Sequence, residues 1–235
     1  MIANSTKLMC YPLLRWCGSL FRTLPKKLLT QTQVIHIVMQ IILASGSQVR
    51  AQMLRQAGLD FEVKIARVDE QMIKESLLGD GRSSRDIADA LAESKARKVA
   101  QNNYDAFVIG CDQVLDFQGK LLTKPKSPEN AIEQIKSMRG ERHMLLSAAV
   151  IYHEGKPIWR HIGQVRLRMR DASDTYIEKY VGRNWDSIRH SVGGYKLEEE
   201  GVRLFHSIEG DYFNVLGMPL LELLAFLTLR GVIEK

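Results

Sequence analysis

Hydroxyls and an arginine gather where a strand gives way to a helix, in IILASGSQVRAQML at residues 41–54. An apolar run meets Ser45-Gly46-Ser47, and a helical pattern that includes Arg50 follows. A helix N-terminus exposes unpaired backbone N–H groups and the positive end of the helix dipole, and small residues let an anion approach them. These residues suit a phosphate-binding turn, with Arg50 as its fixed charge. The same sequence also fits an ordinary serine cap of the helix beside a solvated arginine.

A lysine stands on the apolar side of the next expected helix. In DIADALAESKARKVA, Lys95 lies four residues from both Leu91 and Val99, so it shares their face. A lysine at such a position either extends its amine to water or pairs with a buried anion. That anion is a carboxylate or a phosphate.

Carboxylates follow two expected strands. Asp112, in FVIGCDQV, comes just past a short apolar strand, where α/β proteins often hold ligand-binding groups, although an aspartate that closes a turn is common there. Asp69 and Glu70 are expected to end another strand. Two or three carboxylates beside several cations would form a site for Mg²⁺ or Mn²⁺ bound to a phosphate ester.

Other catalytic patterns are absent from the sequence. It has no Walker loop, GxGxxG, GxSxG or HExxH, and its six histidines lack metal-ligand spacing. The three cysteines form no CxxC, which argues against a disulfide framework or a zinc site, and we expect Cys111 to be a small buried residue. A reducing, cytoplasmic setting fits best.

The net charge of +6 is concentrated in residues 1–38, which hold five basic residues and no acidic one. The remaining 28 basic residues face 27 acidic ones, so a nucleic-acid partner loses its main support. We expect residues 1–38 to be an extension outside the fold, with Met39 as the working start. A targeting or membrane-surface segment and an ordered appendage are the alternatives. No apolar run is long enough to span a bilayer, so no membrane partner is expected.

The remaining chain, residues 39–235, is expected to form one α/β domain. Helices and strands interleave without strict βαβ regularity, which indicates a twisted mixed sheet flanked by helices. The expected strands are 40–44, 61–65, 106–109, 114–117, 120–122, 143–152 and 157–170, and the expected helices are 47–57, 84–101, 127–140, 173–181 and 220–230.

Taken together, these segments resemble the Maf family of nucleotide pyrophosphatases. The likeness runs from about residue 39 to residue 230, and the combination is specific although each piece is weak. It rests on LASGSQVR, VDE at residues 68–70, LAESKA, IGCDQV, LLTKP at residues 121–125, and GGYKLEEEGVRLFHSIEGDYFNVLGMPL at residues 193–220.

The resemblance implies both a fold and a reaction. The fold would be two lobes around a cleft, related to the inosine-triphosphate pyrophosphatases. A nucleoside triphosphate and water would give the monophosphate and pyrophosphate, with a divalent cation. Asp112 would be the general base, or else a metal ligand with Asp69 and Glu70. The phosphate-binding residues would be Ser45, Ser47, Arg50, Lys95 and Lys124, and the chain would form a homodimer.

This sequence departs from the family pattern around the phosphate turn. Gln48 replaces the usual proline, and Val49 stands where many members have arginine or tryptophan. Gln113 after Asp112 resembles the subgroup that hydrolyses 7-methyl-GTP, whereas threonine is usual in the dTTP and UTP enzymes. We therefore expect Gln113 to contact a modified nucleotide, which the enzyme would keep out of nucleic acids. The alternatives are dTTP or UTP hydrolysis, or a regulator of cell division that senses a nucleotide without hydrolysing it.

Overall fold

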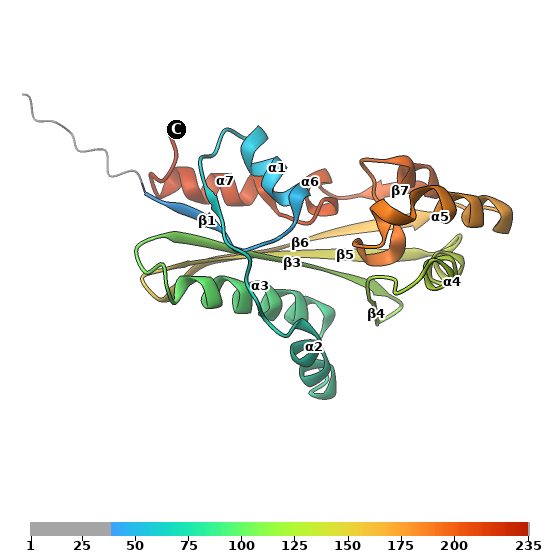
Figure 1. Ribbon diagram of the computed structural model, residues 1–235, viewed down its shortest axis with the longest axis horizontal. Helices are drawn as coiled ribbons and strands as arrows, with labels where there is room; N and C mark the ends of the chain where they lie inside the picture. Colours follow the sequence, from blue (N-terminus) through green and yellow to red (C-terminus); the bar gives the residue numbers. More distant parts are fainter. Residues whose placement is uncertain (1–38, 235) are drawn as a thin grey trace, which may run out of the picture. The chain divides into compact units, whose positions relative to one another are not determined.

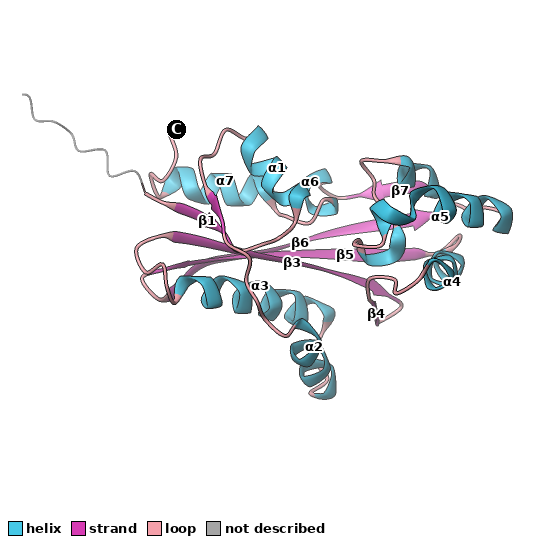
Figure 2. Ribbon diagram, viewed as in Figure 1, coloured by secondary structure: helices cyan, strands magenta, loops and turns pink. Residues whose placement is uncertain are grey.

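The computed structural model describes residues 39–234, so our prediction for residues 1–38 lies outside the described residues. One mixed sheet of seven strands organises this part of the chain, in the order β2-β1-β3-β5-β6-β7 with β4 paired to β3 (Figure 2). β1 runs parallel to β2 and β3, and the other pairs are antiparallel. The strands are β1 (Ile41–Leu43), β2 (Glu62–Val63), β3 (Phe107–Phe117), β4 (Lys120–Leu122), β5 (Arg142–His153), β6 (Lys156–Met169) and β7 (Phe205–Glu209).

Helices cover both faces of the sheet, which confirms the predicted α/β class (Figure 1). α3 packs on one face, whereas α1 and α7 cover one part of the other face and α4 and α5 cover a second part. The helices are α1 (Gln48–Gln56), α2 (Glu70–Gly79), α3 (Ser84–Ala100), α4 (Pro128–Met138), α5 (Asp174–Ile188), α6 (Tyr212–Val215) and α7 (Leu220–Leu229), with 3₁₀ segments at Val192–Gly194 and Glu200–Leu204.

The predicted helix boundaries at 47, 84 and 127 are confirmed by side-chain caps. Ser47, Ser83 and Ser127 each accept a hydrogen bond from the backbone N–H three residues later. At α3 the carboxylate of Asp86 returns the bond to Ser83, which completes a capping box. The start of α1 therefore lies directly after the turn that contains the phosphate-binding candidates.

The strand that holds Asp112 was predicted wrongly. Instead of ending near residue 109, β3 runs without interruption from Phe107 to Phe117 and pairs with β5 along most of that length. Asp112 is thus in the middle of a buried strand. The polar pair Asp112 and Gln113 interrupts the apolar pattern, and that interruption imitates a strand end in the sequence.

The prediction that Asp69 and Glu70 end a strand was also wrong. β2 is only two residues long, and Asp69 is the N-cap of α2, where its carboxylate accepts from the backbone N–H of Met72 at 2.9 Å. α2 has no fully buried residue, although Ile73 and Leu77 pack against the α3 cluster. Because this helix lacks a strongly buried stripe, its sequence pattern is weak. β7 and α6 were missed as well.

None of the helices in residues 39–234 is long and apolar enough to cross a membrane.

Candidate functional site

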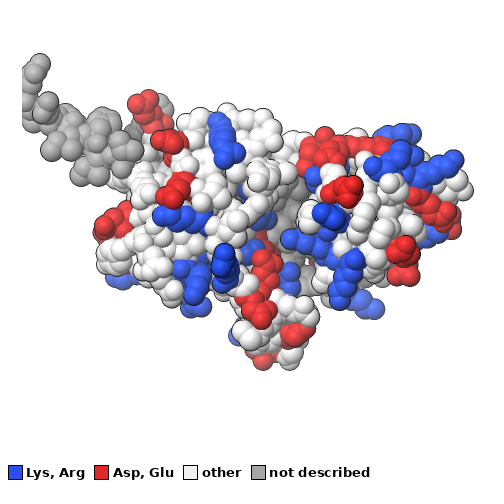
Figure 3. All heavy atoms as spheres, viewed as in Figure 1, with Lys and Arg blue, Asp and Glu red and all other residues white. Residues whose placement is uncertain are grey.

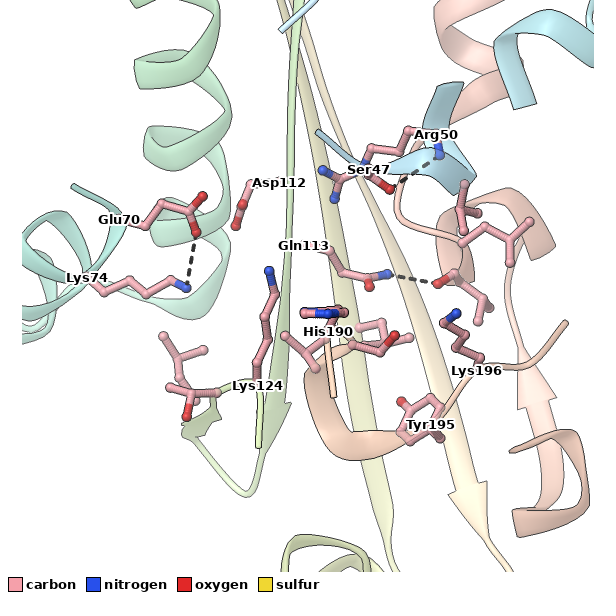
Figure 4. Close-up of a pocket in the computed structure, with 18 of the residues that line it drawn as sticks. Ser47, Arg50, Glu70, Lys74, Asp112, Gln113, Lys124, His190, Tyr195 and Lys196 are labelled. Carbon is pink, nitrogen blue, oxygen red and sulfur yellow. Dashed lines mark hydrogen bonds and ion pairs between the residues drawn. The ribbon is translucent and has the colours of Figure 1, made fainter. Parts of the chain in front are cut away.

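A cavity of about 560 Å³ collects most of the residues singled out from the sequence. It extends around β3, with α2 and α3 on one side of this strand and α1 and residues 190–198 on the other (Figure 4). In Figure 3, basic side chains stand on both sides of the hollow beside α2, with acidic side chains among them. The predicted residues that line the cavity are Ser47, Arg50, Glu70, Lys95, Asp112, Gln113 and Lys124.

A buried ion pair joins α3 to β3 in this cavity. The Nζ of Lys95 lies 2.6 Å from Oδ1 of Asp112 and 2.8 Å from Oε1 of Glu70. Lys95 and Asp112 are only 8% and 5% exposed, so the lysine pairs with an anion instead of extending to water. The other carboxylate oxygen of Asp112, Oδ2, is buried and has no hydrogen-bond partner among the described residues. It is therefore free to accept a proton or bind a cation.

Gly110 allows this pair to form, because α3 crosses β3 almost in contact with its backbone. A Cβ at Gly110 would lie 2.2 Å from the carbonyl oxygen of Ala92 and 2.6 Å from the backbone nitrogen of Ala96. Any larger residue would push the helix away from the strand. The glycine thus sets the separation between Lys95 and Asp112.

Glu70 is held as a carboxylate by the surrounding lysines. Burial acts to raise its pKa, but Lys95, with smaller contributions from Lys74 and Lys124, brings the pKa below its ordinary value. Figure 4 shows the Lys124 amine pointing toward Asp112 and Glu70 from the segment after β4. This part of the cavity therefore combines two carboxylates with several cations.

Arg50, in the first turn of α1 just after the Ser45-Gly46-Ser47 turn, is buried, so a solvated arginine is ruled out. Arg50 donates from Nε to the carbonyl oxygen of Gly217 at 2.8 Å and from Nη1 to that of Cys111 at 3.0 Å. Its Nη1 also donates to Oγ of Ser45 at 3.3 Å. No carboxylate pairs with it in the described part of the chain, so its charge faces the cavity unneutralised.

The two serines of this turn have different positions. Ser47 lines the cavity and caps α1, as the alternative interpretation of the turn expects, whereas Ser45 is buried behind it and supports Arg50. Among the predicted carboxylates, Asp69 caps α2 and does not line the cavity.

Gln113 lines the cavity from the opposite face of β3. Its Nε2 donates to Oγ of Ser147 and to the carbonyl oxygens of Asn214 and Val215, each at 3.0 Å. Gln113 thereby joins the central strands to α6. Its neighbour Cys111 is fully buried, and burial raises the pKa of its thiol to about 11, which confirms a packing role.

Sequence reasoning missed the cavity wall formed by His190, Tyr195 and Lys196 (Figure 4). The Tyr195 hydroxyl lies 2.8 Å from Nε2 of His143, whose pKa burial lowers to about 4, so this imidazole is neutral at pH 7. Lys196 donates to Oγ of Ser187 at 2.6 Å. The Gly193-Gly194 pair and the adjacent charged residues distinguish this segment in the sequence. The segment forms no strand or α-helix, so no periodic pattern shows which of its side chains point into the cavity.

Glu70 and Asp112 offer oxygen donors that suit a hard divalent cation, and Oδ2 of Asp112, which has no partner in the described part of the chain, is the strongest indication of one. No group of three or more histidine, cysteine, aspartate or glutamate side chains within residues 39–234 could hold a metal ion. A cation here would need ligand oxygens from a phosphate to complete its coordination, which is usual for Mg²⁺.

Comparison with known proteins identifies the family. The profile described as "Maf-like protein" matches residues 40–229, which is most of the chain. The chain belongs to the Maf family. Two relatives of this Maf chain, from Ruegeria sp. (strain TM1040) and Ruegeria pomeroyi, are each 66% identical to it over 83% of its length and 98% of their own, and both are named nucleoside triphosphate pyrophosphatase. A 7-methyl-GTP pyrophosphatase from Brucella abortus is 40% identical over 84% of the Maf chain and all of its own length.

Proposed function

We propose that this Maf chain hydrolyses a nucleoside triphosphate to the monophosphate and pyrophosphate. The observation that carries the proposal is the Lys95–Asp112 pair in the cavity, with Oδ2 of Asp112 buried, without a partner among residues 39–234, and beside the cations Arg50 and Lys124. Relatives with 66% identity are named for this activity. The ion pair in the cavity and the names of these relatives both support a hydrolase that acts on an acid anhydride.

The charges in the cavity suit this reaction. A triphosphate brings close to four negative charges, and fixed cations stabilise the charge that develops on the leaving pyrophosphate. Arg50, Lys95 and Lys124 hold the phosphates in this scheme, with the Ser47 hydroxyl and the N-terminus of α1 as further donors.

Asp112 acts as the general base in this scheme. Its Oδ2 accepts a proton from a water molecule as the water oxygen bonds to the α-phosphorus. The bond from the α-phosphorus to the oxygen that bridges to the β-phosphorus breaks, and that oxygen leaves with pyrophosphate. Lys95 keeps the carboxylate oriented through its 2.6 Å contact with Oδ1.

Mg²⁺ or Mn²⁺ is part of the proposal, held by Glu70 together with phosphate oxygens; in the alternative scheme Asp112 is a second metal ligand in place of the general base. Such an ion would neutralise phosphate charge and lower the pKa of a bound water molecule. Asp69, the third ligand candidate from the sequence, instead orders the first turn of α2 and so positions Glu70.

The proposed substrate is a modified nucleotide such as 7-methyl-GTP. Support comes from Gln113 on the cavity wall and from the relatives named 7-methyl-GTP pyrophosphatase at 40% identity. The alternative substrates are dTTP and UTP. We also propose that the enzyme works in the cytoplasm as a homodimer, without nucleic-acid or membrane partners, and removes the nucleotide before it enters nucleic acids.

The proposal is tested by measuring hydrolysis of a panel of normal and modified nucleoside triphosphates, each with Mg²⁺ and with Mn²⁺. We expect pyrophosphate as the product and 7-methyl-GTP as the preferred substrate. Orthophosphate as the only phosphate product would contradict cleavage between the α and β phosphates. Tight nucleotide binding without any product would favour the regulator that senses a nucleotide.

A further inference from the structure

A second cluster of cations lies outside the cavity, on an uncovered part of the sheet. Along β6, Val165, Leu167 and Met169 are buried under α4 and α5, and the alternate residues point to the opposite face. Arg166 and Arg168 are exposed on that opposite face. Figure 1 shows that the strands continue beyond the first turn of α3, the helix that covers this face elsewhere.

The strand register brings a third arginine directly beside them. Arg142 at the start of β5 is the Cα partner of Arg168 on β6, and both are exposed. Like charges at directly opposite positions of an antiparallel pair destabilise a sheet. We call Arg142, Arg166 and Arg168 the arginine patch.

Carboxylates do not neutralise the patch. None of its three guanidinium groups forms an ion pair or a side-chain hydrogen bond with the residues that the structure describes. Other exposed arginines differ, since Arg139 pairs with Asp174 and Arg183 with Glu200. Two acidic residues are nearby: Glu209 is the Cα partner of Arg166 on β7, and Glu141 precedes Arg142. Neither one forms an ion pair with the patch.

The patch borders a hollow of about 340 Å³. Arg142 and Arg168 line it, Gln118 of the β3–β4 turn and the Gly140-Glu141 connection complete its wall, and none of these five residues belongs to the large cavity. A volume near the lower end of the range for ligand pockets suits a small ligand better than a polymer. Two guanidinium groups favour an anion with several phosphate oxygens, which they bind in a bidentate manner.

We propose that the arginine patch is a second binding site for a small polyphosphate anion, of which inorganic pyrophosphate is the simplest. Binding is favoured at this part of the sheet because the anion offsets the repulsion between Arg142 and Arg168. The site is independent of Asp112 and of the reaction proposed for the large cavity.

Calorimetric titration of the full chain with inorganic pyrophosphate, in a low-salt buffer without divalent cations, tests the proposal. We expect the double variant Arg142→Gln/Arg168→Gln to lose one binding site, with affinity at that site reduced at least about tenfold. The matched control, Arg97→Gln/Arg230→Gln, removes the same charge from exposed arginines elsewhere and should keep the wild-type number of sites. An equal number of sites and equal affinity in wild type and Arg142→Gln/Arg168→Gln would overturn the proposal.

Thermal melting separates a binding role from a structural one. Without ligand, Arg168→Gln should melt at or above the wild-type temperature, because a like-charge pair is removed. Pyrophosphate should raise the melting temperature of Arg97→Gln/Arg230→Gln more than that of Arg142→Gln/Arg168→Gln. A lower melting temperature in Arg168→Gln with an unchanged response to pyrophosphate would show that the arginines are structural. Patch-dependent binding of RNA without any patch-dependent binding of pyrophosphate would also contradict the proposal.

Discussion

Asp112 combines burial, an ion pair and an unsatisfied oxygen in one side chain. Lys95 occupies Oδ1, and Oδ2 is left without a partner in the described structure. A buried carboxylate oxygen without a hydrogen-bond partner costs free energy. A water molecule, a cation or a proton that reaches Oδ2 supplies that partner, and each of these is a species that the proposed reaction brings to Asp112.

We predict that Asp112→Asn lowers pyrophosphate release by at least about 100-fold, because an amide cannot accept the proton. The measurement is turnover per folded molecule, with folding checked by circular dichroism. Asp116→Asn is a matched control: Asp116 is four residues along the same strand, is also buried, and accepts hydrogen bonds from Ser84 and from the backbone of Gly119. Comparable turnover in both variants would remove Asp112 from its assigned role.

Lys95→Met should make the melting temperature of the protein depend on divalent cations. The substitution suits the apolar face of α3 but leaves the carboxylates of Glu70 and Asp112 without the cation that they share. We expect a lower melting temperature than wild type, a larger rise on addition of Mg²⁺, and slower turnover. If Mg²⁺ stabilises the variant no more than it does the wild-type protein, the two carboxylates do not form a cation site.

Much of the residue pattern was predictable, and the exceptions have physical causes. The 3.6-residue period was enough to place Lys95 on the buried side of α3, because that face is continuous. Arg50 was expected at an anion site, but its bond to the carbonyl of Gly217 joins residues 167 positions apart, and no local pattern contains that contact. His190 and Tyr195 were missed for the same reason.

At the scale of elements, the site depends on how closely α3 lies against β3. The two elements meet at Gly110, whose missing side chain leaves room for the backbone of Ala92 and Ala96. The caps of α1 and α3 could be predicted from serines, because capping is local. The close crossing could not be predicted, because it is a property of two segments packed together.

Gly110→Ala should therefore damage both stability and catalysis. The added methyl group would overlap the α3 backbone, so we expect destabilisation of about 1–3 kcal/mol, measured by denaturant unfolding. The surviving folded fraction should show a lower kcat, since Lys95 would shift relative to Asp112. Gly182→Ala is the control, because a Cβ there meets nothing within 4 Å. A folded Gly110→Ala enzyme with wild-type kcat would contradict the link between this crossing and the chemistry.

At the scale of the whole molecule, three hydrophobic clusters share a single sheet, and residues packed in all three of them line the cavity. All of the side chains that line it come from residues 47–216. The predicted mixed sheet was correct because alternation and helical period identify most elements. The missed helix α2 shows the limit of such patterns, since it supplies Glu70 while burying little of itself.

Removal of residues 1–38 should leave kcat and KM within about twofold of the full chain, because every residue assigned to the reaction lies beyond them. The measurement is steady-state hydrolysis by both forms. Salt-dependent binding to nucleic acid, compared in the same two proteins, checks whether the five basic residues create an affinity of their own. A large loss of turnover would require a role for the extension in the site.

Asp112 and Gln113 are consecutive residues on one strand and point to opposite faces of the sheet. α3 holds the first through Lys95, and α6 holds the second through the backbone carbonyls of Asn214 and Val215. Under the proposed function, an evolving sequence could exchange the residue at position 113 and its neighbours in α6 while α3 keeps the catalytic group in place. One rigid strand would then let relatives diverge in nucleotide preference without rebuilding the reaction each time.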